Sequence, residues 1–248
     1  MVLTADSLKR LAKDVKYILK NPLTNDNMNI YYKHDEENIL KGYAMIIGND
    51  DTPYSYGYYF FEFNFPDNYP FEPPRVRFLT NDGHMRFHPN LYINGKVCLS
   101  ILNTWNGEGW TSCQNIRSIL IILASIFNTC PLTNEPGINK NNPNIIKYNL
   151  SVGFKNIEHS IIKQISIINK PHELDKPESN YRKILLIFKD AVKENFIKNR
   201  DAISMNINKL SEMYSNYEYI YISTYNLNYK LDFNKLMSGF EAFKSTYN

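Results

Sequence analysis

The sequence predicts an α+β fold in which a helix, an antiparallel sheet and further helices follow one another along the chain. Three observations support this prediction. Apolar residues recur at helical spacing near the N-terminus, four short runs rich in aromatic and β-branched residues follow, and helical patterns return from about residue 143. Because short turns join the four runs, we expect a four-stranded antiparallel meander.

The first helix is expected at residues 3–20, where Asn21-Pro22 ends the pattern. Lysines follow the face opposite the apolar one. The apolar face consists of Leu8, Leu11, Ala12, Val15, Ile18 and Leu19.

The strands are expected at about 28–34, 40–48, 57–65 and 75–80. The segment between the last two contains four prolines, which lack an amide hydrogen and restrict the residue before them, so we expect no regular structure there. Residues 81–112 also show no periodic pattern.

A central helix is expected to begin at Thr111-Ser112-Cys113-Gln114, which fits a capping box, and to end before Pro131. Its apolar stripe consists of Ile116, Ile119, Leu120, Leu123 and Phe127.

The remainder of the chain is predicted to be mostly helical. The tyrosine-rich stretch 214–229 fits either a strand or a helix, and we interpret it as a packing surface rather than a binding site. We expect a catalytic core at 1–150 and a helical extension at 151–248 that packs on or next to it. The predicted helices of this part lie at 143–169, 177–199, 202–216 and 232–245.

Composition and charge exclude several classes of protein. The 248 residues carry a net charge of +3, which is too mild to predict a nucleic-acid partner. The N-terminus lacks the apolar region of a secretory signal, and the longest apolar run, 119–127, is too short to predict a membrane span. The three cysteines, Cys98, Cys113 and Cys130, contain no C-x-x-C pair, so we expect no metal site. Since no secretory signal accompanies this small set of cysteines, we expect a reduced protein of the cytoplasm, the nucleus or both.

The stretch HPNLYINGKVCL combines a turn-forming triplet with a lone cysteine, and Cys98 stands eight positions after Asn90. A thiol after a Gly-Lys turn is a candidate nucleophile, and the charge of Lys96 favours its thiolate form. The alternative for Cys98 is a small buried hydrophobic residue.

The chain resembles the ubiquitin-conjugating enzymes in several features that occur together: the first helix, the meander, YPFEPPRVRF, FHPN and the cysteine followed by LSIL. The resemblance runs from about Leu8 to Gly137. The segments NTWNGEGW and NEPG are similar to the larger subgroup that includes the Z-type enzyme, whereas residues 150–248 resemble its tail only weakly.

This resemblance implies that Cys98 accepts ubiquitin as a thioester from an activating enzyme and passes it to a substrate lysine, with or without a ligase. It implies that Asn90 donates to the oxyanion, with an Asn that only braces the turn as the alternative. The family often has an Asp at the mouth of the site, where this sequence has Asn134 followed by Glu135. These two residues are the candidates for the environment of the acceptor lysine, and Glu135 has the alternative of a solvated loop carboxylate. No cofactor is expected, since the activating enzyme uses the ATP.

Other residues are expected to shape the active-site loop or its partner surfaces. His88, in this motif, is expected to fix the loop rather than act as a base. Residues 103–109 lengthen the loop beside the cysteine. The loop residues predicted from the resemblance are His88, Pro89, Trp105 and Trp110.

Lys9, Arg10 and Lys13 match the face that docks the activating enzyme, with a solvated basic face as the alternative. Phe65 and Ser112 match the two loops that meet RING-type ligases, although the second loop lacks the family's Ser-Pro-Ala. Two rival functions remain: a carrier of another ubiquitin-like modifier, and a non-catalytic module that binds ubiquitin or a ligase.

Overall fold

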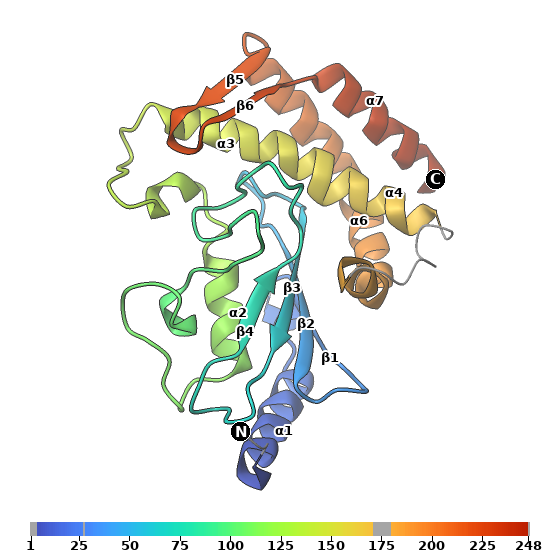
Figure 1. Cartoon of the computed structure of the whole chain (residues 1–248). Coiled ribbons are helices and arrows are strands. Elements are labelled where there is room, and N and C mark those ends of the chain that lie inside the picture. Colours follow the sequence, from blue (N-terminus) through green and yellow to red (C-terminus); the bar gives the residue numbers. More distant parts are fainter. Residues whose placement is uncertain (1–3, 27, 171–179, 248) are drawn as a thin grey trace.

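The computed structural model describes residues 4–26, 28–170 and 180–247 and confirms the α+β class (Figure 1). An N-terminal helix, a sheet and a second helix form the first part of the chain. Their bounds are α1 (Ala5–Lys20), β1 (Ile30–His34), β2 (Lys41–Ile47), β3 (Tyr58–Asn64), β4 (Arg75–Phe78) and α2 (Ile116–Ser125).

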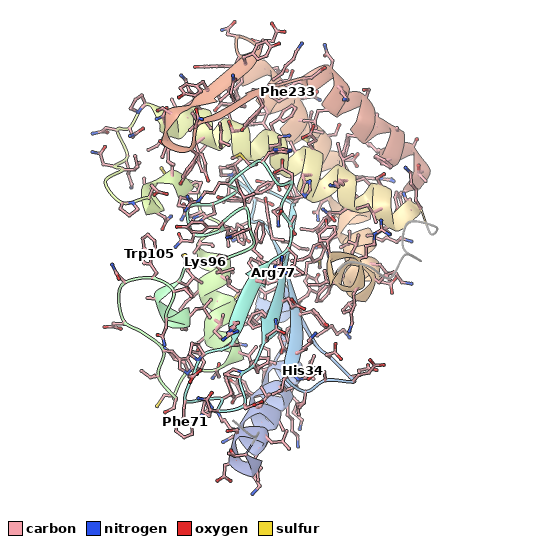
Figure 2. The ribbon with its side chains drawn as sticks, viewed as in Figure 1. His34, Phe71, Arg77, Lys96, Trp105 and Phe233 are labelled. Carbon is pink, nitrogen blue, oxygen red and sulfur yellow. The ribbon has the colours of Figure 1, made fainter. Side chains whose placement is uncertain are left out.

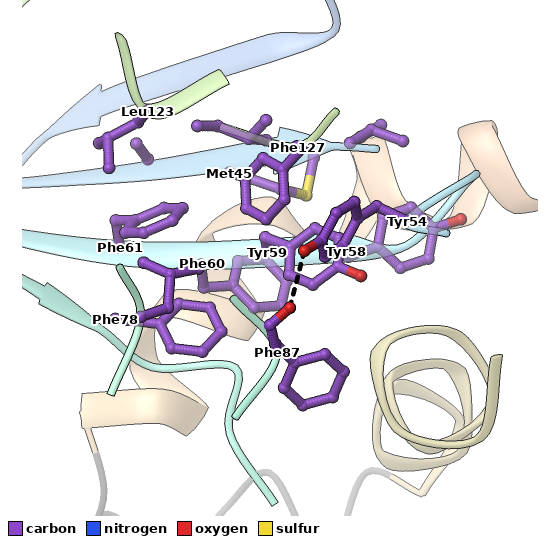
Figure 3. Close-up of a cluster of buried hydrophobic side chains, with 14 of the residues drawn as sticks. Met45, Tyr54, Tyr58, Tyr59, Phe60, Phe61, Phe78, Phe87, Leu123 and Phe127 are labelled. Carbon is purple, nitrogen blue, oxygen red and sulfur yellow. Dashed lines mark hydrogen bonds between the residues drawn. The ribbon is translucent and has the colours of Figure 1, made fainter. Parts of the chain in front are cut away.

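The four strands form one antiparallel sheet in the order β1-β2-β3-β4, which confirms the predicted meander. The sheet is covered on both faces, because alternate side chains of β3 contact different elements. Tyr59 stacks on Phe127, which follows α2, with ring centroids 4.5 Å apart, whereas Phe60 stacks on Phe188 of the C-terminal part at 6.2 Å. Figure 3 shows this aromatic core, in which the Tyr54 hydroxyl donates to the Phe87 carbonyl at 2.7 Å.

Helix α1 begins at Ala5 rather than at the predicted residue 3, ends at Lys20 as predicted, and buries a narrower face. The Thr4 side chain caps it by accepting from the Ser7 amide at 3.1 Å. Leu8 is 38% exposed and Leu19 51% exposed, although both belong to the predicted apolar stripe. The buried face instead includes Asp14, whose carboxylate accepts from the Tyr69 hydroxyl at 2.7 Å, so part of it is polar.

Helix α2 starts further along the chain than the capping box predicted. Gln114 Oε1 accepts from the Thr111 amide at 3.0 Å, so half of the box forms. The helix itself is capped by Asn115, whose side chain accepts from the Ser118 amide at 3.1 Å. The predicted stripe from Ile116 to Leu123 is buried.

The structure of the C-terminal part joins two of the predicted helices and decides between the two alternatives for 214–229. The two helices expected at 177–199 and 202–216 form one helix, α6 (Asn180–Met213), and residues 177–179 lie outside the described residues. The stretch 214–229 contains a hairpin rather than a helix, because side chains of its first strand are alternately exposed and buried. The elements are α3 (Asn144–Lys155), a π-helical segment (Asn156–Lys163), α4 (Gln164–Asn169), α6, β5 (Tyr219–Ile222), β6 (Leu227–Lys230) and α7 (Phe233–Lys244).

The C-terminal part packs directly on the sheet. Asn156, which is 1% exposed, accepts from the Tyr59 hydroxyl at 2.6 Å and donates to the Ser55 carbonyl at 2.9 Å. Apolar residues of α6 extend the same hydrophobic core. The boundary at residue 150 therefore separates two segments that share a core, and the division into a catalytic core and an extension stays a prediction.

Among the helices of the described residues, none has both the length and the apolar character needed to cross a membrane.

Candidate active site

The fold brings Asn90 and Cys98 face to face across the loop between β4 and α2. The Cys98 amide donates to the Asn90 carbonyl at 2.9 Å, and the Asn90 side-chain Nδ2 donates to the Cys98 carbonyl at 2.6 Å. The eight-residue spacing in the sequence therefore becomes direct contact, and Asn90 braces the backbone that carries the thiol.

Thr104 closes the cysteine loop from its other side. Its hydroxyl accepts from the Leu99 amide at 2.9 Å and lies 2.8 Å from the Val97 carbonyl, to which it donates. Cys98, held between these two residues, is only 2% exposed, so the candidate nucleophile is buried in this conformation. Thr104 stands in the lengthened loop, and no motif in the sequence indicated its role.

His88 holds the turn through its ring. It is fully buried, and its Nδ1 accepts from the Asn90 amide at 3.0 Å. Burial, assisted by the nearby charge of Arg86, lowers the pKa of His88 to about 3. The ring is thus neutral and a weak base near neutral pH, and Pro89 beside it is also buried.

Folded-state stability is expected to fall as pH is lowered from about 7 to about 5. Burial also lowers the pKa of His159 to about 4, so both buried histidines stay neutral in the folded protein while they gain a proton on unfolding. The unfolded state then binds more protons, and each histidine contributes up to about 1.4 kcal/mol per pH unit. Denaturant unfolding of His159→Gln should show a shallower pH dependence than that of His84→Gln, an exposed control. Equal slopes would contradict this account.

The turn after α2 places the two acceptor-site candidates beside the same loop. Asn134 Nδ2 donates to the Pro131 carbonyl at 3.1 Å and lies 3.4 Å from His88 Nε2. Glu135 is not a free loop carboxylate: its Oε2 accepts from the Tyr225 hydroxyl at 2.6 Å and lies 4.0 Å from the Arg86 guanidinium.

The two tryptophans occupy different environments. Trp105 is 42% exposed on the lengthened loop, whose residues 103–109 are all exposed, and lies on the same flank as Lys96 (Figure 2). The Trp110 amide donates to Asn103 Oδ1 at 2.8 Å, and its indole N–H donates to the Pro70 carbonyl at 2.7 Å. Trp110 therefore ties the lengthened loop to the proline-rich loop.

Phe65 cannot contact a ligase as predicted, because its side chain is 4% exposed. It packs against Phe63 and Tyr69, with ring centroids 6.3 and 5.3 Å away. The aromatic residue that the proline-rich loop does present to solvent is Phe71, which is 77% exposed (Figure 2).

Arg10 differs from the two lysines predicted beside it. Its guanidinium pairs with Asp14 at 2.9 Å and donates to the Ser112 and Gln114 carbonyls, both at 2.7 Å. It therefore joins α1 to the segment that contains Ser112, which is itself exposed, as are Lys9 and Lys13.

Among residues 4–26, 28–170 and 180–247, we find no group of three or more His, Cys, Asp or Glu side chains that could hold a metal ion.

Comparison with known proteins places this site in a family. A family model of ubiquitin-conjugating enzymes matches residues 10–161, more than half of the chain. Ubiquitin-conjugating enzyme E2 Z of Danio rerio is 43% identical over 130 residues, which are 52% of this chain and 38% of that protein. "Probable ubiquitin-conjugating enzyme protein 17" of Caenorhabditis elegans is 35% identical over 191 residues, which are 73% of this chain and 25% of that protein.

Among solved structures, human Ubiquitin-conjugating enzyme E2 G1 matches with 28% identity and a TM-score of 0.42 over 50% of this chain and 94% of that chain. The chain spans well under half the length of the curated relatives named above. On the strength of the family model, the chain belongs to the ubiquitin-conjugating enzymes, a family of transferases, with similarity to the subgroup that includes the Z-type enzyme.

Proposed function

We propose that this protein carries ubiquitin as a thioester on Cys98 and transfers it to lysine amines of substrate proteins. The contact between Asn90 and Cys98, in a chain of this family, is the observation that carries the proposal. The partners are ubiquitin, its activating enzyme, a RING-type or other ligase and the substrate proteins, encountered in the cytoplasm, the nucleus or both.

The first step exchanges one thioester for another. The sulfur of Cys98 bonds to the C-terminal carbonyl carbon of ubiquitin, and the bond from that carbon to the activating enzyme's sulfur breaks. Because the two thioesters have similar energies, the step needs a thiolate more than a strong base. The neutral, buried His88 fits this requirement, since its ring holds the turn and is a weak base.

The second step passes through a tetrahedral oxyanion, which a positioned amide stabilises. Asn90 Nδ2 uses one hydrogen on the Cys98 carbonyl, which leaves its second hydrogen for the oxyanion. The amide nitrogen is the atom that faces the cysteine backbone, whereas Asn90 Oδ1 is buried and has no hydrogen-bond partner among the described residues. Bracing and oxyanion stabilisation are thus compatible roles of the same side chain.

The acceptor lysine reaches this site as an ammonium group and has to lose a proton before it attacks. We assign Glu135 to orient the amine, since it directly follows Asn134, whose amide lies 3.4 Å from His88, and its carboxylate is fixed by the Tyr225 hydroxyl. Phe71 is the residue we propose for contact with a ligase, because the Trp110–Pro70 hydrogen bond holds its loop beside the segment with Ser112.

Replacing Asn90 with Ala should leave charging largely intact and slow discharge to free lysine by roughly 10²–10³-fold, the usual loss for one oxyanion donor. Single-turnover discharge of purified thioester measures this effect. Asn94→Ala, on the exposed turn of the same loop, is the matched control. If charging fails while whatever thioester forms discharges normally, Asn90 only braces the loop.

Replacing Lys9 and Lys13 with Glu should slow charging at low salt and leave discharge of purified thioester unchanged. The expected cause is lost electrostatic attraction to the activating enzyme, which salt screens. Arg10 is kept, because it joins α1 to the Ser112 segment. Lys189→Glu with Lys198→Glu, exposed on α6, makes the same charge change and serves as the control. Equal charging rates in the two variants would refute the docking surface.

The proposed function is tested by incubating the protein with ubiquitin, activating enzyme and ATP and running the product on a gel without reductant. A shift that thiol reductant reverses supports the proposal. No shift with the ubiquitin system, but one with another modifier and its activating enzyme, would support the first rival. No shift with any system would favour the non-catalytic module.

A further inference from the structure

The hairpin of the C-terminal extension contacts Glu135, one of the two acceptor-site candidates, through its turn. Tyr225 closes a short turn between β5 and β6, and Asn226 after it has left-handed backbone with φ of 50°. The turn is anchored on α3, where Asn144 Nδ2 donates to Ser223 Oγ at 3.1 Å and the Tyr148 ring lies 5.7 Å from that of Tyr225. Residues about 90 positions apart, Tyr225 and Glu135, are thereby brought into contact.

Tyr225 contacts Glu135 with its hydroxyl and Arg86 with its ring. The hydroxyl donates to Glu135 Oε2 at 2.6 Å, and the ring centroid lies 4.8 Å from the Arg86 guanidinium carbon. Burial, and then the hydrogen bond to Glu135, raise the pKa of Tyr225 above its ordinary value. The hydroxyl therefore remains a donor at any physiological pH.

Arg86 connects this contact to the turn that holds the cysteine loop. Its guanidinium carbon contacts two rings, since it lies 3.9 Å from the ring centroid of Tyr92, which follows the His88–Asn90 turn, and 4.8 Å from that of Tyr225. Its Nη2 donates to the Pro89 carbonyl, next to Asn90, and lies 4.0 Å from Glu135. Tyr225 thus contacts Glu135, an acceptor-site candidate, and Arg86, which is hydrogen-bonded to the turn that contains Asn90.

We propose that Tyr225 is a positioning residue for acceptor-lysine transfer, which fixes the Glu135 carboxylate through its hydroxyl and the Arg86 guanidinium through its ring. The inference rests on the proposed function and assigns a role in that function to the C-terminal extension. With Oε2 of Glu135 occupied by Tyr225, the other carboxylate oxygen is held in one orientation to accept from the incoming amine.

The reaction that Tyr225 would assist is amide formation. The lysine ammonium gives one proton to water, its nitrogen bonds to the carbonyl carbon of the thioester, and a second proton leaves as the tetrahedral intermediate collapses. The carbon–sulfur bond breaks and Cys98 departs as thiolate. Glu135 only orients the amine, so no proton accumulates on the protein.

Tyr225→Phe removes the hydroxyl and keeps the ring over Arg86. Discharge of preformed thioester to free lysine should slow about tenfold, the factor expected for losing a hydrogen bond to a charged group. Discharge to hydroxylamine, which is largely unprotonated at neutral pH and presents no ammonium group for the carboxylate to hold before proton loss, should slow less. Tyr219→Phe, on the exposed face of the same hairpin, should match wild type with both nucleophiles.

A double-mutant cycle identifies the partner. Glu135→Gln should slow lysine discharge by a similar factor, and adding Tyr225→Phe to it should have little further effect. Any of three results would overturn the inference. The lysine rates of Tyr225→Phe and wild type could be equal, Tyr225→Phe could slow discharge to hydroxylamine as much as discharge to lysine, or the losses could be additive in the double variant. These outcomes are read on thioester already formed, whereas failure of the proposed function itself would appear as failure of wild type to charge.

Discussion

Cys98→Ser should convert the reductant-sensitive product into a reductant-stable one. The serine hydroxyl occupies the place of the thiol and forms an oxygen ester, which thiol reductants do not cleave, while Cys98→Ala has no nucleophile and should form no product at all. Gels run with and without reductant measure the difference. We expect the loss of thioester to be complete in both variants, the largest change in activity predicted for any substitution in this chain.

The two other cysteines are matched controls for this prediction. Cys113 is exposed and Cys130 partly exposed, and neither is in a disulfide. Cys113→Ser and Cys130→Ser should both charge like wild type. A thioester that survives in Cys98→Ala, or disappears in Cys113→Ser, would show that the wrong thiol has been assigned.

Phe188→Ala should cost about 3–5 kcal/mol of the free energy of unfolding, the usual range for removing a buried phenylalanine. Phe188 is 3% exposed and stacks on Phe60 of β3, so the substitution leaves a cavity between α6 and the sheet. Since a domain is typically stabilised by only about 5–15 kcal/mol, the midpoint of denaturant unfolding should drop markedly.

Met205→Ala, on the same helix but at a position 72% exposed, should change stability by less than about 0.5 kcal/mol. A loss below about 1 kcal/mol for Phe188→Ala would mean that α6 adds little to the core.

Truncation after residue 150 tests the same packing on a larger scale. We expect an insoluble product, because removing α6 uncovers the second face of the sheet, whereas a soluble product would support an independently folding core.

The order and type of the early elements could be predicted because their apolar patterns are local. The meander is an example, since strand periodicity and short turns determine which strands pair. The helix start at Asn115 instead of Thr111 was not predicted, because two overlapping caps fit the sequence and tertiary packing selects between them. The alternating burial of β5 was similarly hidden, since tyrosine suits both a packed and an exposed strand face.

The candidate site was predictable where a motif specifies it and not where it depends on distant contacts. The motif indicated Cys98 and Asn90, and the structure adds the two hydrogen bonds between them. Phe65 was the wrong aromatic for a docking surface, because pattern alone does not show which of two nearby phenylalanines, Phe65 or Phe71, is buried. Tyr225 gave no local signal at all, since its contact with Glu135 depends on how the extension folds back.

The most direct test of the account is the intact mass of the charged wild-type protein, followed by peptide mapping without reductant. The account predicts one added ubiquitin less one water, attached through Cys98, and full return to the starting mass when reductant is added. Two results would contradict the proposed carrier role of Cys98. One is an unchanged mass in the presence of active activating enzyme and ATP, and the other is attachment at a residue other than Cys98.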